Sequence, residues 1–238
     1  MLFFNRTALK STVEPEEKED RVMTMADRNL MTKTTGIVLH SAARYDLVVW
    51  LAMLGRERAF REKVVQLARL EPGESVLDVG CGTGTLAIAA KRQVGPEGSV
   101  TGIDASPEML TRAYKKARKA GIELIFKNAL AEALPFPDAQ FDVVLTTVML
   151  HHLPHNARQQ CAREIRRVLK PCGRVLAVDF GRDPEKRGLL AHLHRRHGHV
   201  TLSDMLTLLT EAGFKSIQSG EVGIRNLQFV LAVTSCCE

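Results

Sequence analysis

Short apolar runs alternate with amphipathic segments along most of the chain from residue 75 onward. The runs are rich in Val, Ile and Leu, whereas the segments between them repeat apolar residues every three or four positions. The apolar runs predict strands at residues 75–79, 99–104, 123–127, 141–147, 174–180, 214–222 and 227–233. The amphipathic segments predict helices at residues 45–54, 58–70, 85–93, 107–120, 156–169 and 202–212.

The order of these elements predicts an α/β fold. Strands that alternate with helices form a parallel sheet with right-handed crossovers and with helices on both faces. The last two predicted strands are close enough in sequence to pair as a hairpin. We therefore expect a doubly wound, seven-stranded, mostly parallel sheet with an antiparallel edge hairpin, preceded by N-terminal helices.

Two charge-rich segments do not follow this pattern of strands and helices. Residues 1–34 are polar and charge-rich, so they predict a flexible N-terminal arm, and residues 35–238 then form one domain. A domain of this size buries a core without metal or disulfide support. Residues 181–200 interrupt the pattern as a charged insert or lid before the last predicted helix.

A glycine-rich turn follows the first predicted strand. Gly80, Gly82 and Gly84 alternate with other residues just after Asp78, and a second acid, Asp104, ends the next strand 26 residues further along. Such a turn lets a ligand approach the backbone closely, and a second-strand carboxylate can bind a ribose diol. Dinucleotide sites space their glycines as G-x-G-x-x-G, whereas here the third glycine comes one residue early.

With this spacing, the chain from about residue 45 onward resembles the class I S-adenosylmethionine (SAM)-dependent methyltransferases. Within that class it is similar to the small-molecule C-methyltransferases of ubiquinone and menaquinone biosynthesis. The resemblance lies in residues 76–84, 102–110, 131–144 and 164–174. It implies a Rossmann-like fold, SAM as the cofactor, S-adenosyl-L-homocysteine (SAH) as its product, and methyl transfer to O, C or N of a small organic metabolite.

The resemblance also implies where the cofactor would bind. The expected contacts are Tyr45, Asp78, Gly80, Cys81, Gly82, Thr83, Gly84, Asp104, Ala105, Ser106, Met109, Asn128, Ala129, Leu130, Ala131, Thr146 and Thr147. The turn would cradle the methionine part of SAM, with Asp78 at its ammonium and Asp104 at the ribose hydroxyls. Met109 would pack on the adenine, Thr146 and Thr147 would border the sulfonium, and Tyr45 would fold over SAM.

One expected contact departs from the family pattern. Leu130 stands where the family usually has Asp or Asn bonded to the adenine amino group. Either Asn128 replaces that bond from a shifted loop, or backbone and packing alone hold the adenine. The lost bond is worth about 0.5–1.5 kcal/mol, so weaker SAM binding is expected. A second departure, Pro171-Cys172-Gly173 in place of Pro-Gly-Gly, lies in a predicted turn.

Methyl transfer needs a general base only when the acceptor arrives protonated, because much of the rate comes from alignment. The candidate bases are His151 and His152, which follow the fourth predicted strand. The alternative is that both are packing or hydrogen-bonded loop residues. Residues 192–199 hold four further histidines. This segment is interpreted as a solvated loop, a lid or a metal site. No nearby carboxylate or cysteine completes a set of metal ligands, so no metal is expected.

Charge and cysteine content limit the kinds of binding partner and the cellular compartment that we expect for this chain. The net charge is +6, but aromatic residues make up only 5% of the chain, which disfavours nucleic acid. The five cysteines have no spacing typical of a disulfide framework or a zinc site, which favours a reducing cytoplasm. No signal peptide and no transmembrane segment are expected. A small-molecule methyl acceptor is the expected partner, and a homodimer is allowed.

Four alternatives to this hypothesis remain. Cys161, Cys236 and Cys237 would suit an arsenic methyltransferase, although apart from Cys81 the cysteines expected near the active loops are missing. A nucleotide-dependent dehydrogenase would share the turn, although not its glycine spacing. An RNA or protein methyltransferase would share the cofactor, but the segment after the fourth strand lacks the Asn/Asp-Pro-Pro-Tyr/Phe motif that acts on planar nitrogen. A non-catalytic SAM-binding protein is the fourth alternative, and the Leu130 departure is compatible with it.

Overall fold

The computed structural model describes residues 57–181, 200–224 and 226–236. The predicted arm at residues 1–34, the predicted helix at residues 45–54 with Tyr45, and residues 182–199 of the predicted insert lie outside these residues. The four histidines between residues 192 and 199 lie outside them as well.

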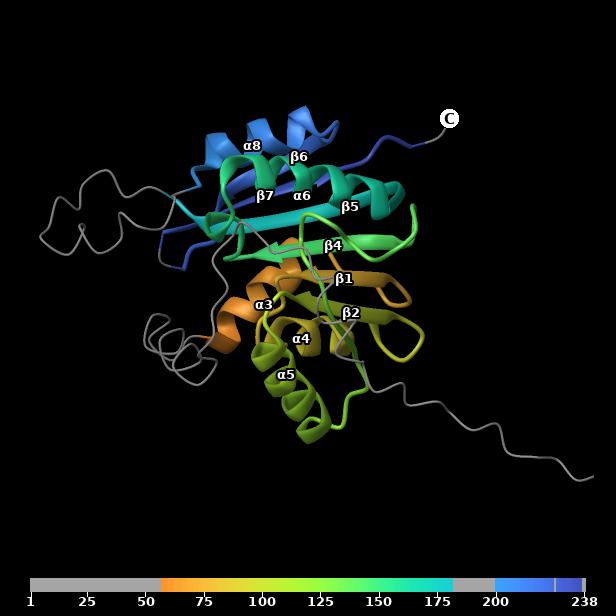
Figure 1. The fold of residues 1–238 in the computed structure, drawn as a ribbon. Helices are drawn as coiled ribbons and strands as arrows, with labels where there is room; N and C mark the ends of the chain where they lie inside the picture. Colours follow the sequence, from red (N-terminus) through yellow and green to blue (C-terminus); the bar gives the residue numbers. More distant parts are fainter. Residues whose placement is uncertain (1–56, 182–199, 225, 237–238) are drawn as a thin grey trace, which may run out of the picture. The chain divides into compact units, whose positions relative to one another are not determined.

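The described residues form a seven-stranded sheet with the order β3-β2-β1-β4-β5-β7-β6 (Figure 1). Strands β1 to β5 pair in parallel, and β7 pairs antiparallel with both β5 and β6, which confirms the predicted fold class. The bounds are β1 Ser75–Val79, β2 Ser99–Asp104, β3 Ile125–Asn128, β4 Phe141–Thr147, β5 Leu169–Phe180, β6 Lys215–Glu221 and β7 Leu227–Val233.

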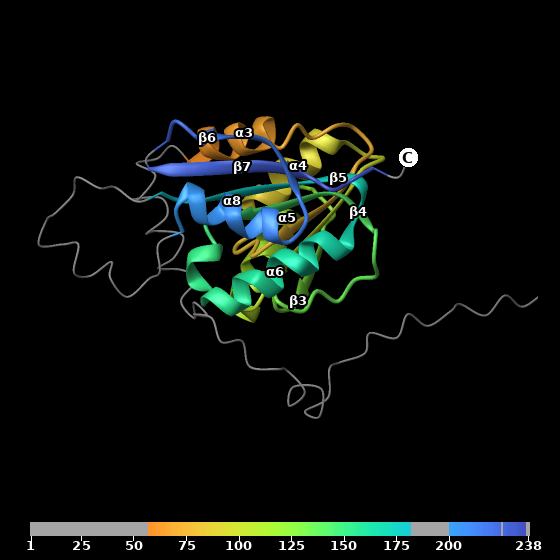
Figure 2. The same ribbon diagram turned by 90° about the horizontal axis from the view of Figure 1, so that it is seen from above.

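Helices cover both faces of the sheet, with α3 and α4 on one side and α6 and α8 on the other (Figure 2). The helices are α3 Glu57–Leu67, α4 Thr85–Val94, α5 Pro107–Lys119, α6 His155–Val168 and α8 Leu202–Glu211, with a short 3₁₀ helix, η1, at Leu150–His152. Phe60 and Leu110 belong to the core on the first side, and Ile165 and Met205 to the core on the second. None of the described helices is long and apolar enough to cross a membrane.

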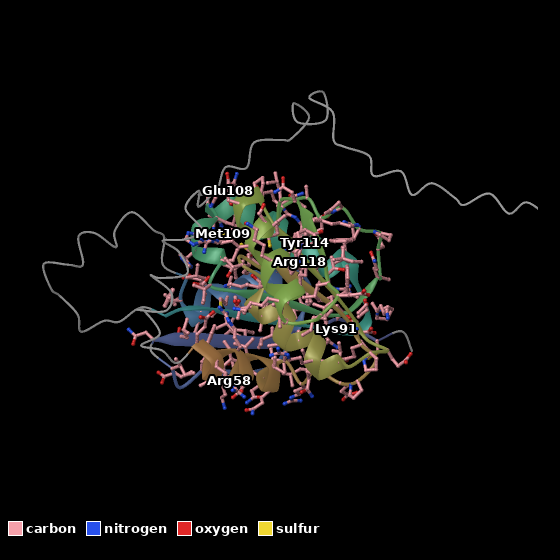
Figure 3. All side chains as sticks on the ribbon, turned by 90° about the horizontal axis from the view of Figure 1, so that it is seen from below. Arg58, Lys91, Glu108, Met109, Tyr114 and Arg118 are labelled. Carbon is pink, nitrogen blue, oxygen red and sulfur yellow. A yellow bond between two sulfur atoms is a disulfide. The ribbon has the colours of Figure 1, made fainter. Side chains whose placement is uncertain are left out.

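Local signals in the sequence explain where these helices begin. Ser106 caps α5 by accepting a hydrogen bond from the Met109 amide, and proline at the first helical position is preorganised for the turn. Figure 3 labels four residues along α5; of these Met109 is buried, whereas Tyr114 and Arg118 are exposed. The alternation of buried and exposed residues holds this helix against the sheet with its basic face outward.

Two predicted boundaries are wrong by three residues or more, and several others by one or two residues. Strand β5 begins at Leu169 rather than at residue 174, because the predicted Pro-Cys-Gly turn continues the strand through a register shift opposite Phe141 and Val143. Cys172 takes a left-handed φ of 60° there. Helix α3 ends at Leu67 rather than at residue 70, since Arg69 also has a left-handed φ, of 52°, which ends a helix.

A disulfide joins Cys172 to Cys236, although no disulfide was expected from the cysteine spacing. The antiparallel pairing of β5 with β7 sets Arg174 opposite Val233, so the residues just beyond this pair on each chain segment come together. The two Cα atoms are 4.5 Å apart. The pairing of β5 with β7 therefore brings the two cysteines together. This pairing cannot be read from the spacing of the cysteines along the sequence.

Candidate cofactor and acceptor site

The glycine turn leaves β1 and closes onto the end of β2. Gly80, Gly82 and Gly84 have φ values of 73°, 53° and 76°, a region that favours glycine. The amides of Gly80 and Cys81 both donate to the Ile103 carbonyl, at 2.9 and 2.8 Å. The amide of Gly82 donates to Oδ2 of Asp104 at 2.9 Å. The turn and the second acidic residue thus form one connected unit.

Neighbouring side chains leave no room for a larger residue at the ends of the turn. A Cβ on Gly80 would clash with Cγ of Met149, and a Cβ on Gly84 would lie 2.8 Å from the Ala113 side chain. Met149 follows β4, so the Gly80 contact ties the turn to the loop that carries the two candidate histidines. The backbone of the glycine turn is therefore packed closely against Met149 at one end and against Ala113 at the other.

Asp78 is fully buried beside the turn, and neither carboxylate oxygen has a hydrogen-bond partner within the described residues. Burial raises the pKa of this carboxyl to about 7; the positive charge of Arg61 lowers it, and the negative charge of Asp104 raises it further. The Ala87 amide also lowers this pKa slightly, without meeting hydrogen-bond geometry. A buried carboxylate without partners is costly unless a ligand supplies them.

Arg61 on α3 brings a positive charge to the same place. Its Nε atom is buried and lacks a hydrogen-bond partner in the described part of the chain, while Nη2 lies 3.4 Å from Glu57 Oε1. Arg61 and Asp78 therefore offer unsatisfied groups of opposite charge around the turn. Such a pair complements the ammonium and carboxylate of an amino-acid group.

Asp104 ends β2 with both oxygens turned toward backbone amides. Oδ2 accepts from Gly82 and Oδ1 accepts from Ser106, each at 2.9 Å. Burial raises its pKa, and the bonds from Ser106 and Gly82 oppose that rise. An ionised carboxylate has about four acceptor sites, so these two bonds leave capacity for ribose hydroxyls.

The loop after β3 runs beside Asp104. The Asn128 side-chain amide donates to the Asp104 carbonyl at 2.8 Å, and the Ala129 amide donates to the same oxygen at 3.2 Å. Only the amide nitrogen of Asn128 can face a carbonyl, so its Oδ1 remains as an acceptor. Leu130 and Ala131 follow as half-buried residues. The loop therefore offers one side-chain acceptor, from Asn128 rather than from position 130.

The remaining predicted residues of the turn and of α5 are mostly buried. Burial raises the pKa of the Cys81 thiol well above its usual value, so this cysteine is a neutral packing residue. Thr83 Oγ1 accepts a bond from Lys116 Nζ at 2.7 Å. Met109 in the first turn of α5 is buried, and Ala105, which follows β2, is half-buried.

The end of β4 is strained and polar. Thr146 and Thr147 are buried, and Oγ1 of Thr146 has no hydrogen-bond partner among the described residues. Val148 follows with a φ of 55°, which is a true outlier for a β-branched residue. Its amide donates to the Val178 carbonyl at 2.7 Å, which holds the strained residue in place. Strain of this kind gathers at functional sites.

His151 in η1 is bonded to a buried acid that sequence reasoning missed. Its Nδ1 lies 2.7 Å from Oδ1 of Asp179, and its amide donates to Oδ2 at 3.1 Å. Asp179 is fully buried near the end of β5. The available signal was an acid close to the end of a predicted strand, the pattern already shown by Asp78 and Asp104. The His152 ring lies 3.9 Å from that of His151, centroid to centroid.

Parallel register brings these groups to one edge of the sheet. Asp78, Asp104, Asn128, Thr146 and Asp179 lie at or near the carboxyl ends of β1, β2, β3, β4 and β5. Ligands of open α/β sheets bind in the crevice outside these ends. Within the described residues, no cluster of His, Cys, Asp and Glu could hold a metal ion.

Comparison with known proteins agrees with this geometry. Residues 76–173 match the model of a methyltransferase domain family. The ubiquinone/menaquinone biosynthesis C-methyltransferase UbiE of Bordetella avium is 38% identical over 61% of this chain and 56% of its own length. The demethylmenaquinone methyltransferase of Lactobacillus johnsonii is 39% identical over 56% of this chain and 55% of its own. The chain thus spans little more than half the length of these relatives.

Solved structures extend the likeness to the whole fold. A SAM-dependent methyltransferase from Aquifex aeolicus superposes with a TM-score of 0.66 at 25% identity, over 79% of this chain and 97% of that one. The [4+2]-cyclase SpnF shares the fold alone, with a TM-score of 0.66 at 20% identity over 86% of this chain and all of that one. These comparisons show a SAM-dependent methyltransferase domain within this chain, support S-adenosyl-L-methionine as its cofactor, and make the chain similar to the ubiquinone/menaquinone C-methyltransferases.

Proposed function

We propose that the chain binds SAM at the carboxyl edge of its sheet and transfers the methyl group to a small organic acceptor. The observation that carries this proposal is Asp78, a buried carboxylate without hydrogen-bond partners in the described residues, beside a turn that approaches a ligand through its backbone. An ammonium group placed there would satisfy Asp78, and the nearby charge of Arg61 suits the carboxylate of the same amino-acid group.

The other groups fit the rest of the cofactor. Asp104 would accept hydrogen bonds from the ribose hydroxyls, and Oδ1 of Asn128 would accept one from the adenine amino group. Met109 would pack against the adenine ring. When bound, SAM supplies a methyl group activated by a sulfonium, and we place it beside Thr146, whose buried hydroxyl has no partner among the described residues. Most of the rate then comes from alignment, worth up to about 7–11 kcal/mol.

The names of the two relatives suggest the first acceptor to try. One is named as a C-methyltransferase of ubiquinone and menaquinone biosynthesis, and the other as a methyltransferase of demethylmenaquinone. A reduced naphthoquinone without its ring methyl is therefore the first probe. Transfer to carbon of such a ring, a cytoplasmic location and a homodimer remain predictions for this chain.

The test is methyl transfer by the full chain from SAM with a deuterated methyl group to reduced 1,4-naphthoquinone, followed by mass spectrometry. We expect a product that carries the label, with SAH formed in equal amount, and its loss in Asp104→Ala. The fold also occurs in SpnF, titled a [4+2]-cyclase, so fold alone does not establish the reaction. SAM binding without transfer to phenols, amines or the naphthoquinone would favour a non-catalytic SAM-binding protein. Transfer only to RNA or protein would favour an RNA or protein methyltransferase.

A further inference from the structure

We propose that His151 is the general base of this site, positioned by Asp179, and that the acceptor carries a hydroxyl that must lose its proton to react. The inference rests on the proposed function, since it concerns the same site. It adds a third acidic residue, Asp179, and a restriction on the acceptor, which the cofactor contacts do not supply. The geometry of the His151–Asp179 pair carries it.

The buried carboxylate determines which imidazole nitrogen is protonated. Asp179 accepts hydrogen bonds from the His151 amide at 3.1 Å and from the Phe180 amide at 2.7 Å, and its Oδ1 lies 2.7 Å from His151 Nδ1. An ionised carboxylate can only accept, so Nδ1 must hold a proton. In neutral imidazole the lone pair is then on Nε2, the nitrogen that can remove a proton from another molecule.

The Nε2 atom is available for that task. It has no hydrogen-bond partner among the described residues, and 12% of the side chain is exposed. His151 lies four residues after Thr147, on the loop where Met149 meets the glycine turn. Because SAM is proposed to lie at that turn, an acceptor would approach from the side that the histidine borders.

The groups packed around the pair support a role in holding a proton. Arg158 of α6 donates to the Leu150 carbonyl at 2.8 Å and interacts electrostatically with Asp179. The ring centroid of Phe180 lies 5.7 Å from that of His151, and the centroid of His152 lies 3.9 Å from it, with the two histidine rings tilted by 45°. A histidine that served only for packing would not need a fully buried carboxylate, whose desolvation is costly. The carboxylate becomes useful when His151 turns cationic, because it stabilises the imidazolium.

The proposed step balances as follows. His151 Nε2 takes the hydroxyl proton while the acceptor forms its new bond to the methyl carbon. The carbon–sulfur bond breaks, and its electron pair stays on sulfur, so the sulfonium becomes the neutral thioether of SAH. The imidazolium then releases the proton to water. A neutral amine reacts through its own lone pair and can lose its proton afterwards, so a base is decisive for a phenol-type hydroxyl. Ionising that hydroxyl also makes the adjacent ring carbons nucleophilic.

The first test needs no acceptor. Long-range ¹H–¹⁵N NMR of the full chain at pH 8 reports which ring nitrogen is protonated, with His151 assigned by its absence in His151→Gln. We expect a proton on Nδ1 and none on Nε2, and a mixture of both tautomers in Asp179→Asn. A proton on Nε2 in the unsubstituted protein would overturn the proposal.

The second test separates base catalysis from cofactor binding. By calorimetry, His151→Gln should bind SAM within about twofold of the original chain. Its kcat with reduced 1,4-naphthoquinone should fall by about 10²–10⁴-fold, and the rise of rate with pH should disappear. His155→Gln, an exposed histidine at the start of α6, is the matched control and should change neither property.

Three results would contradict the proposal: a loss of SAM affinity above about tenfold in His151→Gln, an unchanged pH profile in that variant, or faster transfer to amines than to phenols. A chain that fails to bind SAM at all would instead refute the proposed function. In that case the tautomer measured by NMR would still decide whether Asp179 positions His151.

Discussion

The described residues place buried charge where a ligand could compensate it, and Asp78 is the clearest example. Sequence reasoning identified Asp78 and Asp104 because each acid ends or nearly ends an apolar strand. It missed Asp179 and Arg61, although both are visible in the sequence. The bond between His151 and Asp179 joins residues 28 apart, and it depends on how β4 and β5 align. Local patterns do not contain that alignment.

Asp78 should destabilise the empty protein at neutral pH. Its folded pKa of about 7 exceeds the ordinary value of 3.8, so protonation favours the folded state. The resulting stability is complete below pH 3.8 and is lost as the pH rises toward about 7. Asp78→Asn should therefore raise the free energy of unfolding by up to about 4 kcal/mol at pH 8, with a gain that shrinks toward pH 4.

Urea denaturation of the SAM-free chain at several pH values measures this gain, and calorimetry should show weaker SAM binding by the same variant. A gain that does not depend on pH would show that the Asp78 carboxylate is not the source.

The elements were largely predictable because buried parallel strands are continuous apolar runs between turn signals. Strands β1, β2, β4 and β7 have the predicted bounds. The start of β5 was not predictable, since Pro171-Cys172-Gly173 has the composition of a turn, whereas the pairing of Leu169 with Phe141 on β4 and the bond from the Thr234 amide to the Gly173 carbonyl keep it in the strand. The roles of Tyr45 and of the histidine-rich insert lie outside the described residues and stay predictions.

Two glycines allow a matched test of the turn. Gly80 and Gly73 both have left-handed φ, at 73° and 87°, but a Cβ would meet Met149 at Gly80 and nothing within 4 Å at Gly73. Each substitution by Ala should cost about 1–2 kcal/mol in backbone strain. Only Gly80→Ala should also weaken SAM binding, because Met149 must move. Equal SAM affinities of the two variants, measured by calorimetry, would contradict the assignment of the turn.

At the scale of the whole domain, the sheet brings distant segments together. Cys172 and Cys236 are 64 residues apart in the chain but occupy adjacent positions because β5 pairs with β7. A cross-link of this kind stabilises chiefly by restricting the unfolded chain. No disulfide was expected from the spacing of the cysteines along the sequence, because this spacing does not show which strands pair in the sheet.

Loss of this disulfide should lower stability without affecting the distant cofactor edge. Cys236→Ser should reduce the free energy of unfolding by about 2–4 kcal/mol in denaturant titration without reductant. Cys237→Ser is the neighbouring control and should leave stability unchanged. Identical unfolding curves for Cys236→Ser and the original chain would show that the bond does not form in solution.

Calorimetric titration of the full chain with SAM measures whether the carboxyl edge of the sheet binds this cofactor. We expect saturable one-site binding in the micromolar range, weakened at least about tenfold in Asp104→Ala. Absence of binding at millimolar SAM, or an affinity unchanged by Asp104→Ala, would contradict this expectation.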